Sequence, residues 1–561
     1  MENTKYTPSR AQASRSAIQK LHVSMSHLFM RGIYKPLGVS GEIMINSMLE
    51  LEPEIYGSIG DEERIELTGL IYIFQRLPLG IEACRFIKFI SREGFEKSNF
   101  EVIVPSKRRR NCYKVDDQQM YIEMTRGKSD VYDVLTHLTF MYIEAEKIRK
   151  NALDGKGRPT IAWSMVKDIA EKIKTGKEFN EEVGFTYLST LLGRTYDETV
   201  KACSEFDNAE GVNSLFEITY WLGQRSIEEY LDNIDREITF SSALREMLGH
   251  HIYGTNWANQ IKQYLFDNNL IEKETHIISS NLHSVLNSLF GNKVLNTKNK
   301  FSNIEEIAEE LSKSGNKVKR ETIRKYAIKN GMVELFDNNG TNITVQIFDC
   351  SKINTSDISP EIKYNNTISD KVIIVMDYAF GQQAFETMDE LLKPYEFENK
   401  KINLNIASVN IMGKAGILCG VKSDIMIPDS HIFEGSADNY YFKNALNVSD
   451  FDDSELSIFE GSMITVLGTS LQNKDILRYF LKSSWGAIGL EMEGAHYQKA
   501  IQSASKIRKS ISSDVKIRYA YYASDNPLET GSTLASGSLG LGGVKPTYMI
   551  TIAILNGVFK Q

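Results

Sequence analysis

The sequence predicts two parts: a mostly α-helical N-terminal domain over residues 1–270 and a three-layer α/β/α domain over residues 271–561. Two observations lead to this prediction. Apolar residues recur at helical spacing through the first part, whereas the second part alternates short apolar runs of strand type with helical segments. Such alternation is typical of a sheet whose faces are covered by helices. A chain of 561 residues is also too long for one ordinary hydrophobic core.

Helical periodicity dominates residues 12–270. It is clearest in three segments, 18–29, 67–77 and 134–142. One strand-like run interrupts it at 100–105, and the basic run 107–110 (Lys-Arg-Arg-Arg) follows. Two interpretations of the basic run stay open. In the first, its guanidinium groups bind a phosphate, because their paired N–H groups match the phosphate oxygens. In the second, the run is a solvated loop beside Asp116 and Asp117.

The second part is expected to begin with a strand at 275–281 and a helix at 283–290. A helical hairpin at 303–331, a β-hairpin around the turn 337–340 and a polar loop insertion at 351–370 follow. The remaining expected strands are 372–376, 402–409, 424–427, 463–467, 486–490 and 515–522. The remaining expected helices are 382–392, 474–483, 493–509 and 548–559.

Composition and charge exclude several classes of function. The net charge is −8 and the pI is near 5.8, which argues against a dominant nucleic-acid or membrane-surface role. No signal peptide and no bilayer-spanning apolar tract is visible, so we expect a cytoplasmic protein without a membrane partner. The five cysteines form no C-x-x-C pair and are expected to be reduced thiols.

DNA binding is a third hypothesis, because the hairpin 303–331 resembles a helix-turn-helix. It ranks last, because a DNA-binding protein is expected to have a broader basic surface than a chain of net charge −8 offers.

Glycine-rich segments follow or flank three of the expected strands, and we expect them to be turns. They are 378–381, 412–417, and the pair 461 and 468–470. In open α/β sheets, ligands bind at the carboxyl ends of strands, where glycine lets the backbone approach closely. These turns are therefore candidate ligand-contacting segments.

Two acidic sites lie at expected strand ends. Glu491 and Glu493 occur where a strand passes into a helix, and Asp525 follows the strand 515–522. A carboxylate that accepts sugar hydroxyls and a second carboxyl that donates a proton suit the cleavage of a glycosidic bond. Structural interpretations are also open: Glu493 stabilises a helix N-terminus, and Asp525 makes an Asx-turn before Pro527.

Three motifs together resemble the nucleoside phosphorylase and nucleosidase superfamily. Residues 413–417 (GKAGI) and 423–430 (SDIMIPDS) are similar to its Gly-x-Ala-Gly and Gly-Asp-Ile-Val-Ile-Pro-Asp-Ser signature. Residues 491–495 (EMEGA) are similar to its Met-Glu ribose motif. Residues 524–528 (SDNPL) are similar to its Ser-Asp base motif, and most of all to that of AMP nucleosidase. The order and spacing also agree, and the resemblance covers roughly residues 275–561, leaving the first part unassigned.

The resemblance implies roles in the cleavage of an N-glycosidic bond. Glu493 would accept hydrogen bonds from the ribose hydroxyls, with the Met492 thioether packed under the sugar. Asp525 would protonate the purine base at N7, and Ser524 would orient Asp525. The implied substrate-binding residues are Glu491, Met492, Ser524, Gly413, Lys414, Ala415, Gly416 and Gly381.

The sequence favours water over orthophosphate as the nucleophile. Phosphorylases of this family hold phosphate with arginines near the glycine turns. Here Arg478 is the only arginine between Val372 and Ala500, and it falls in an expected helix. Lys414 either holds a nucleotide 5′-phosphate or is solvated. Asp377, directly after the strand 372–376, is the candidate base that activates water.

The main hypothesis is a purine nucleotide or nucleoside N-ribohydrolase that needs no cofactor and no metal. One alternative is a purine nucleoside phosphorylase that uses orthophosphate. Another is a non-catalytic nucleotide sensor, in which the helical half transmits the signal. The resemblance also implies a homo-oligomer, because the family commonly builds assemblies with shared active sites.

Overall fold

The computed structural model describes residues 9–108, 110–296, 300–337, 340–365, 368–451, 455–529 and 539–560. Within these residues the chain forms two compact units. The first unit contains Met1–His250 together with the short segment Ser470–Ile476. The second contains His251–Thr469 and Leu477–Gln561. Helix α10 (Ile252–Asp267), which the sequence analysis grouped with the N-terminal domain, belongs to the second unit.

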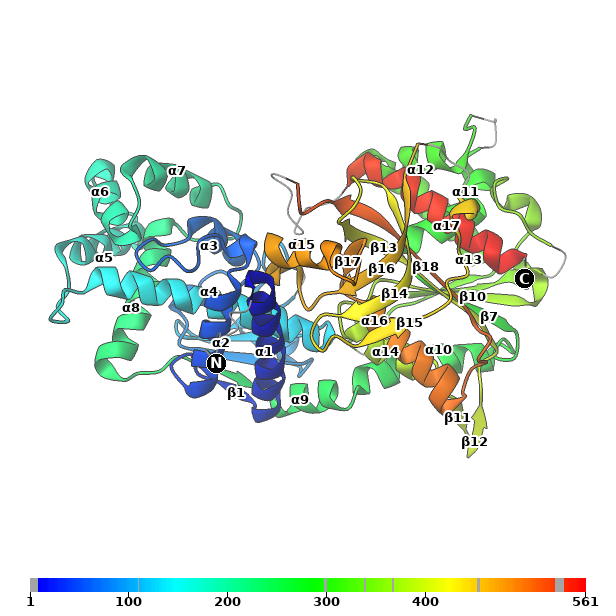
Figure 1. Ribbon diagram of the computed structural model, residues 1–561, viewed down its shortest axis with the longest axis horizontal. Coiled ribbons are helices and arrows are strands. Elements are labelled where there is room, and N and C mark those ends of the chain that lie inside the picture. Colours follow the sequence, from blue (N-terminus) through cyan, green and yellow to red (C-terminus); the bar gives the residue numbers. More distant parts are fainter. Residues whose placement is uncertain are drawn as a thin grey trace, which may run out of the picture. The chain divides into compact units, whose positions relative to one another are not determined.

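The first unit is mostly helical, as predicted (Figure 1). Its helices are α1 (Arg10–Arg31), α2 (Val39–Leu51), α3 (Leu67–Phe74), α4 (Gly127–Ala152), α5 (Ile161–Lys174), α6 (Glu181–Leu192), α7 (Tyr196–Asp207), α8 (Leu215–Asp232) and α9 (Ser242–Gly249). Capping side chains determine where two of these helices begin. Ser9 forms a capping box with the third residue of α1, and Thr195 forms one with the third residue of α7. Helix α4 is buried along most of its length and is the centre of this unit.

A small sheet in the first unit was largely missed by the sequence analysis. Its six strands lie in the order β1-β6-β2-β5-β4-β3. They are β1 (Ile33–Tyr34), β2 (Phe86–Ile90), β3 (Glu101–Ile103), β4 (Cys112–Lys114), β5 (Gln119–Glu123) and β6 (Glu237–Phe240). Only β3 was expected. The other strands have two to five residues and lie between helical segments, and tertiary pairing determines them.

Two arginines of the basic run 107–110 pair with helix α4 and are not solvated beside Asp116 and Asp117. Arg110 is buried and pairs with Asp130 of α4 at 2.8 Å, and Arg108 pairs with Asp133 at 3.2 Å. Arg109 lies outside the described residues. The two described arginines therefore anchor the loop between β3 and β4 to α4.

The second unit is built on a mixed sheet. Strands β10 (Lys371–Met376), β7 (Glu274–Ser279), β13 (Ile406–Ile417) and β18 (Lys516–Asp525) lie side by side in this order and run parallel to one another. On the outer side of β10, β9 (Val345–Asp349) and β8 (Met332–Leu335) pair antiparallel, which confirms the predicted β-hairpin. Its turn residues 338 and 339 lie outside the described residues. Two further strands, β11 (Tyr395–Phe397) and β12 (Lys400–Ile402), form a separate hairpin.

Five strands of the second unit close into a ring. Strand β13 pairs with β18, β18 with β14 (Ile425–Phe433), β14 with β16 (Ile458–Thr465), β16 with β17 (Gly489–Glu491), and β17 returns to β13. Strand β15 (Asn439–Tyr441) extends β14 on its outer side. The sheet is therefore open along β7 to β8 and closed into a small barrel beyond β13.

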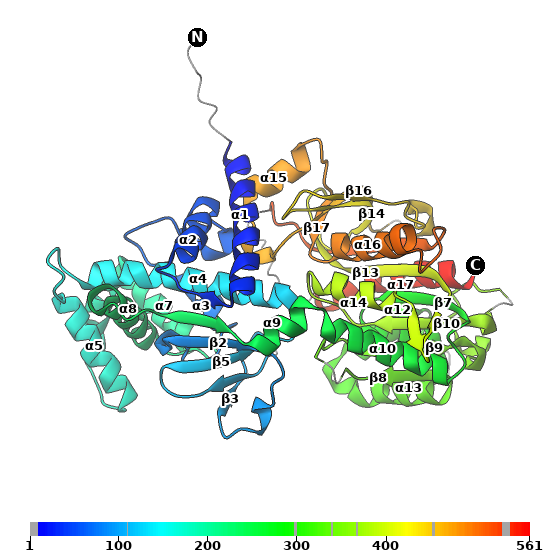
Figure 2. The same cartoon turned by 90° about the horizontal axis from the view of Figure 1, so that it is seen from below.

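Helices cover both faces of the sheet, which confirms the predicted three layers (Figure 2). Helices α10, α14 (Gln383–Leu391) and α16 (Gly494–Gln502) share one hydrophobic cluster with the sheet. On the other face lie α11 (Leu282–Leu295), α12 (Ile304–Ser312), α13 (Lys317–Lys329) and α17 (Val544–Phe559). Helices α12 and α13 are the predicted helical hairpin, and α15 (Lys474–Lys482) also lies where a helix was expected.

Two local predictions in this unit were wrong. Residues 412–417 are not a turn, because β13 continues without interruption to Ile417. Gly461 lies inside β16 and not before a strand. The helix expected over 493–509 is present as α16, and its continuation, Ser503–Arg508, is π-helical. The loop insertion 351–370 contains short 3₁₀ turns.

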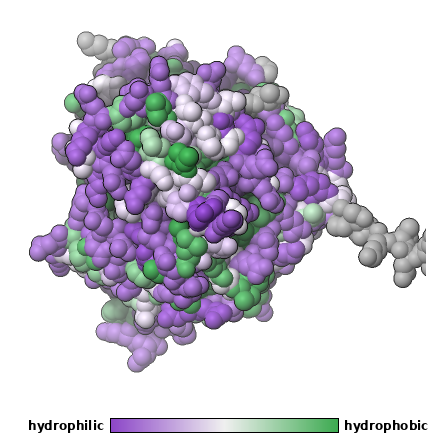
Figure 3. All heavy atoms as spheres, turned by 90° about the vertical axis from the view of Figure 1, so that its left-hand side faces the viewer, coloured by the Kyte–Doolittle hydropathy of each residue, from purple (hydrophilic) through white to green (hydrophobic). Residues whose placement is uncertain are grey.

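None of the helices in the described part of the chain has the length and apolar character that a bilayer crossing requires. Figure 3 shows the face of the first unit that lies on the left of Figure 1. Most of its side chains are hydrophilic, and hydrophobic side chains appear among them in small groups. This distribution is that of an ordinary solvated surface.

Candidate active site

The candidate site lies where β13 passes from the open sheet into the barrel. On one side β13 pairs with β7 as far as Ile411, which lies opposite Ser279. On the same strand, the pairing with β17 begins only at Gly416, which lies opposite Leu490. Between these pairings, residues 412–415 meet β18 but have neither β7 nor β17 beside them in the described structure. The ends of β7, β10 and β17 converge on this gap, as expected for a ligand site in an α/β sheet.

Glu493 lies at the start of α16 and reaches the end of β10. Its Oε1 accepts a hydrogen bond of 2.9 Å from the backbone N–H of Gly381, in the turn that follows β10. That turn requires a positive φ, which Gly381 adopts at +54°. The Glu493 side chain makes no capping hydrogen bond to α16. Burial raises the pKa of Glu493 to about 8, and the charge of nearby Glu491 contributes to this increase.

Glu491 is buried and fixes the turn between β17 and α16. Its Oε2 accepts hydrogen bonds of 2.5 Å from the backbone N–H groups of Glu493 and Gly494. Its Oε1 accepts a hydrogen bond from the Thr465 hydroxyl at the end of β16. Burial raises the pKa of Glu491 to about 7, and these hydrogen bonds oppose the increase. With both oxygens held by the protein, Glu491 is placed to position Glu493.

Gly494 allows the start of α16 to approach His431 of β14 closely. A Cβ at this position would lie 2.1 Å from Cδ2 and 2.3 Å from Nε2 of the imidazole. His431 is fully buried, its Nε2 lies 3.2 Å from the Tyr521 hydroxyl, and burial lowers its pKa to about 3. The imidazole is therefore a neutral packing surface under the site.

We expect Gly494→Ala to lower the free energy of unfolding by about 1–3 kcal/mol, because the added methyl must displace the packed imidazole. Gly413→Ala is the matched control, since a Cβ there meets only Tyr378 at an ordinary 3.6 Å. It should change stability by less than about 0.5 kcal/mol. Urea unfolding of the three proteins tests the difference. Equal stability of the two variants would contradict the close approach.

Asp525 ends β18 and lies opposite Gly416 of β13. Its Oδ1 lies 2.7 Å from the Ser524 hydroxyl, which is also 3.1 Å from the carbonyl of Ala415. Its Oδ2 is buried and has no hydrogen-bond partner among the described residues. The Asx-turn before Pro527 is made by Asn526, whose Oδ1 accepts from the N–H of Leu528 at 3.0 Å. An unsatisfied buried carboxyl oxygen is costly unless it carries a proton or meets a ligand.

The strand register relates the two acids. Gly416 has Asp525 beside it on β18 and Leu490 beside it on β17. At the usual spacing of adjacent strands, Asp525 and Leu490 are about 10 Å apart. Glu493 follows Leu490 by three residues, so both acids flank the same short stretch of β13.

Asp377, Ser279 and Tyr497 lie at the same end of the sheet. The Asp377 Oδ1 accepts from the N–H of Tyr378 at 2.8 Å, which holds the carboxylate at the end of β10. Tyr497, one turn after Glu493 on α16, has its hydroxyl 2.9 Å from the Ser279 hydroxyl of β7. Burial raises the pKa of Tyr497, and the charges of Glu493 and Asp377 raise it further.

Ser279 and Tyr497 were not among the site residues expected from the sequence. Ser279 could have been found from the polar residues that end the expected strand β7. Tyr497 could have been found because it follows Glu493 by four residues and so lies on the same face of the helix. Of the selected residues, Met492 is half-buried beside Glu493, and Lys414 is exposed on β13 opposite Tyr522. Gly413, Ala415 and Gly416 are strand residues here and not turn residues.

The described arginines near the sheet have other partners. Arg508 pairs with Asp389 at 2.7 Å, and Arg518 donates to Asn410 at 3.1 Å and to the Gly557 carbonyl at 3.0 Å. Asn410 lies on β13 opposite Arg518, well before the gap at 412–415. Arg478 lies on α15, a helix, as expected.

Comparison with known protein families gives one match. Residues 42–311 and 310–560 match the model described as "Family of unknown function (DUF6909)". The chain belongs to this family. No curated protein matches the DUF6909 chain in sequence.

About half of this DUF6909 chain is similar to solved structures of nucleosidases and phosphorylases, at low TM-scores. The 5′-methylthioadenosine/S-adenosyl homocysteine nucleosidase of Campylobacter jejuni is 11% identical, with a TM-score of 0.31, over 52% of this chain and 100% of that chain. The futalosine hydrolase of Helicobacter pylori is 13% identical, with a TM-score of 0.29, over 50% and 98%. The uridine phosphorylase of Vibrio fischeri is 9% identical, with a TM-score of 0.31, over 52% and 93%.

Proposed function

We propose that this DUF6909 protein hydrolyses the N-glycosidic bond of a purine nucleotide or nucleoside. The observation that carries the proposal is a pair of acids: Asp525 lies beside Gly416 of β13, and Glu493 follows β17, the strand on the other side of Gly416. The buried Oδ2 of Asp525 has no described partner, and the Glu493 carboxyl is held at the end of β10 by Gly381. The sequence resemblance to nucleosidases falls on these same residues.

In the proposed reaction, Asp525 transfers its proton to N7 of the purine, so that the base leaves as a neutral molecule. The bond between C1′ and N9 breaks, and positive charge develops on the ribosyl ring. The Glu493 carboxylate accepts hydrogen bonds from the ribose hydroxyls and stabilises that charge. Met492, beside Glu493, packs against the sugar.

Water completes the reaction. Its oxygen forms the new bond to C1′, and its proton passes to the Asp377 carboxylate at the end of β10. Water is preferred to orthophosphate as the nucleophile because a phosphate dianion needs charged donors, and Arg508 and Arg518 are already engaged elsewhere. Lys414, exposed on β13, is the candidate contact for a nucleotide 5′-phosphate.

The test is to incubate the full-length protein with adenine and guanine nucleotides and nucleosides, with and without orthophosphate. Chromatography should show free base with ribose or ribose 5-phosphate in the absence of phosphate. Formation of ribose 1-phosphate only when orthophosphate is present would instead identify a phosphorylase. Binding of a nucleotide without turnover would identify a sensor.

A further inference from the structure

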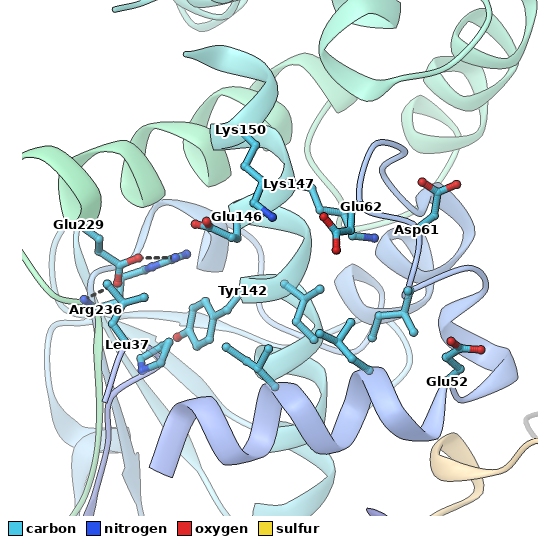
Figure 4. A pocket seen from close by; sticks show the side chains of 16 residues that line it. Leu37, Glu52, Asp61, Glu62, Tyr142, Glu146, Lys147, Lys150, Glu229 and Arg236 are labelled. Atoms are coloured by element: carbon cyan, nitrogen blue, oxygen red, sulfur yellow. Dashed lines mark hydrogen bonds and ion pairs between the residues drawn. The ribbon is translucent and has the colours of Figure 1, made fainter. Parts of the chain in front are cut away.

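The first unit contains a cavity of about 430 Å³ between α2 and α4 (Figure 4). This volume is in the range of small-molecule sites. Its walls are mainly apolar. The apolar side chains that line it are Pro36, Leu37, Ile45, Leu49, Ile59 and Ile143.

Helical spacing gives the cavity an elongated shape. Ile45 and Leu49, one turn apart on α2, face Tyr142, Glu146 and Lys150, which follow each other by single turns on α4. At 1.5 Å per residue, the span from Tyr142 to Lys150 is about 12 Å. Figure 4 shows Arg236 and Glu229 at one end of the cavity, and Asp61, Glu62 and Glu52 toward the other.

A buried ion pair closes the first end. Nη2 of Arg236 lies 2.5 Å from Oε2 of Glu229, and their side chains are only 4% and 2% exposed. The Arg236 backbone N–H donates to the other Glu229 oxygen at 2.7 Å. The Arg236 guanidinium also lies over the Tyr142 ring, 4.5 Å from its centroid. Its Nε and Nη1 are buried and have no hydrogen-bond partner among the described residues.

Charged and exposed groups surround the other end. Glu62 and Lys150 are exposed, whereas Lys147 is buried and pairs with Glu144 at 2.8 Å. Asp61 accepts hydrogen bonds from two N–H groups of its own loop, which hold its pKa below the ordinary value. At one end of the cavity is a buried ion pair that is neutral overall and whose arginine has unused hydrogen-bond donors. At the other end is an exposed opening lined by charged side chains.

We propose that this cavity binds an elongated, uncharged, mostly apolar molecule whose hydrogen-bond acceptor, such as an amide carbonyl, meets Arg236. The apolar body lies between α2 and α4. An acceptor satisfies the unused guanidinium donors, which are costly while unpaired. A carboxylate in the same place would be buried close to the charge of Glu229, and an ammonium close to the charge of Arg236. An uncharged carbonyl avoids both costs. This site is independent of the reaction proposed for the second unit.

The experiment compares three probes of equal chain length on the full-length protein: octanamide, octanoate and octylamine. Isothermal titration calorimetry is expected to show binding of octanamide at least about tenfold tighter than binding of the two charged probes, a difference equal to one well-made buried hydrogen bond.

Variants on α2 locate the binding. Leu49→Trp fills the cavity and should abolish octanamide binding. Ile43→Trp is the control, because Ile43 is 44% exposed on the same helix and does not line the cavity. The Ile43→Trp protein should bind octanamide as tightly as the unchanged protein does. Circular dichroism and thermal unfolding of both variants establish that they are folded.

The outcomes are distinguishable. Absence of octanamide binding, or equal binding by the Leu49→Trp protein, would overturn the site. Tighter binding of octanoate or octylamine that is lost in Leu49→Trp would overturn the assignment of an uncharged ligand. None of these results depends on glycosidic-bond cleavage.

Discussion

Asp525→Asn is expected to lower the rate of purine release by about 10²–10⁴-fold, the usual contribution of a general acid. Asparagine has nearly the same shape, and its carbonyl oxygen can still accept from the Ser524 hydroxyl, which lies 2.7 Å from Oδ1 in the native protein. It has no proton to transfer to N7. The base would then have to leave without protonation, and the barrier to breaking the bond would rise.

The measurement is the initial rate of base release on the substrate identified by the chromatographic screen. Asp429→Asn is the matched control, because this exposed carboxylate on β14 also accepts from an adjacent serine, Ser430, at 2.9 Å. Its rate should equal that of the unchanged protein. Calorimetric binding of the substrate to Asp525→Asn should persist. A rate close to that of the unchanged protein would exclude Asp525 as the proton donor.

Much of the second unit could be predicted from the sequence. Strands such as β10 are fully buried apolar runs between turn residues, and such runs are determined locally. The glycines at 413 and 416 were misleading, because glycine favours turns in general. In the structure they are strand residues that face larger side chains: Gly413 lies opposite Tyr521, and Gly416 lies opposite Asp525. Only the pairing of β13 with β18 reveals this.

The candidate acids could be found from sequence, but their surroundings could not. Glu493 and Asp525 each follow a recognisable strand, so their positions at strand ends were predictable. The hydrogen bond from Gly381 to Glu493 joins residues 112 positions apart, and ring closure from β17 to β13 also joins distant residues, Gly416 and Leu490. Such contacts depend on the whole topology. The cavity between α2 and α4 likewise depends on packing that leaves no periodic signal.

Glu493→Gln is expected to lower the rate of purine release by about 10²–10³-fold, a magnitude typical of losing one preorganised electrostatic group. The amide keeps an oxygen for the Gly381 N–H but has no charge to stabilise the ribosyl cation. Glu460→Gln, an exposed acid on β16, is the control and should leave the rate unchanged. If Glu493 only stabilised the start of α16, its substitution would lower stability and leave the rate per folded molecule intact.

The pH dependence gives a second, independent test of Glu493. Its pKa is raised to about 8, so it is largely protonated at neutral pH and must ionise to act. We therefore expect kcat/KM to rise with pH through about 8, since this ratio reports the free enzyme. In Glu491→Gln this rise should move to lower pH, because the Glu491 charge helps to raise the pKa of Glu493. In Glu493→Gln the rise should vanish.

Protein stability should follow the opposite trend in the same pH range. Glu493 has a folded-state pKa near 8 against an ordinary 4.5, so between these values the folded protein binds more protons than the unfolded chain. The stability that this carboxyl contributes is complete below about pH 4.5 and is lost as pH rises through 8. Urea unfolding across that range should therefore show a falling free energy of unfolding that is shallower in Glu493→Gln. Ionisation of the single Glu493 carboxyl thus explains both the rise in activity and the fall in stability. If surface groups caused either trend, Glu493→Gln would not abolish the one and reduce the other.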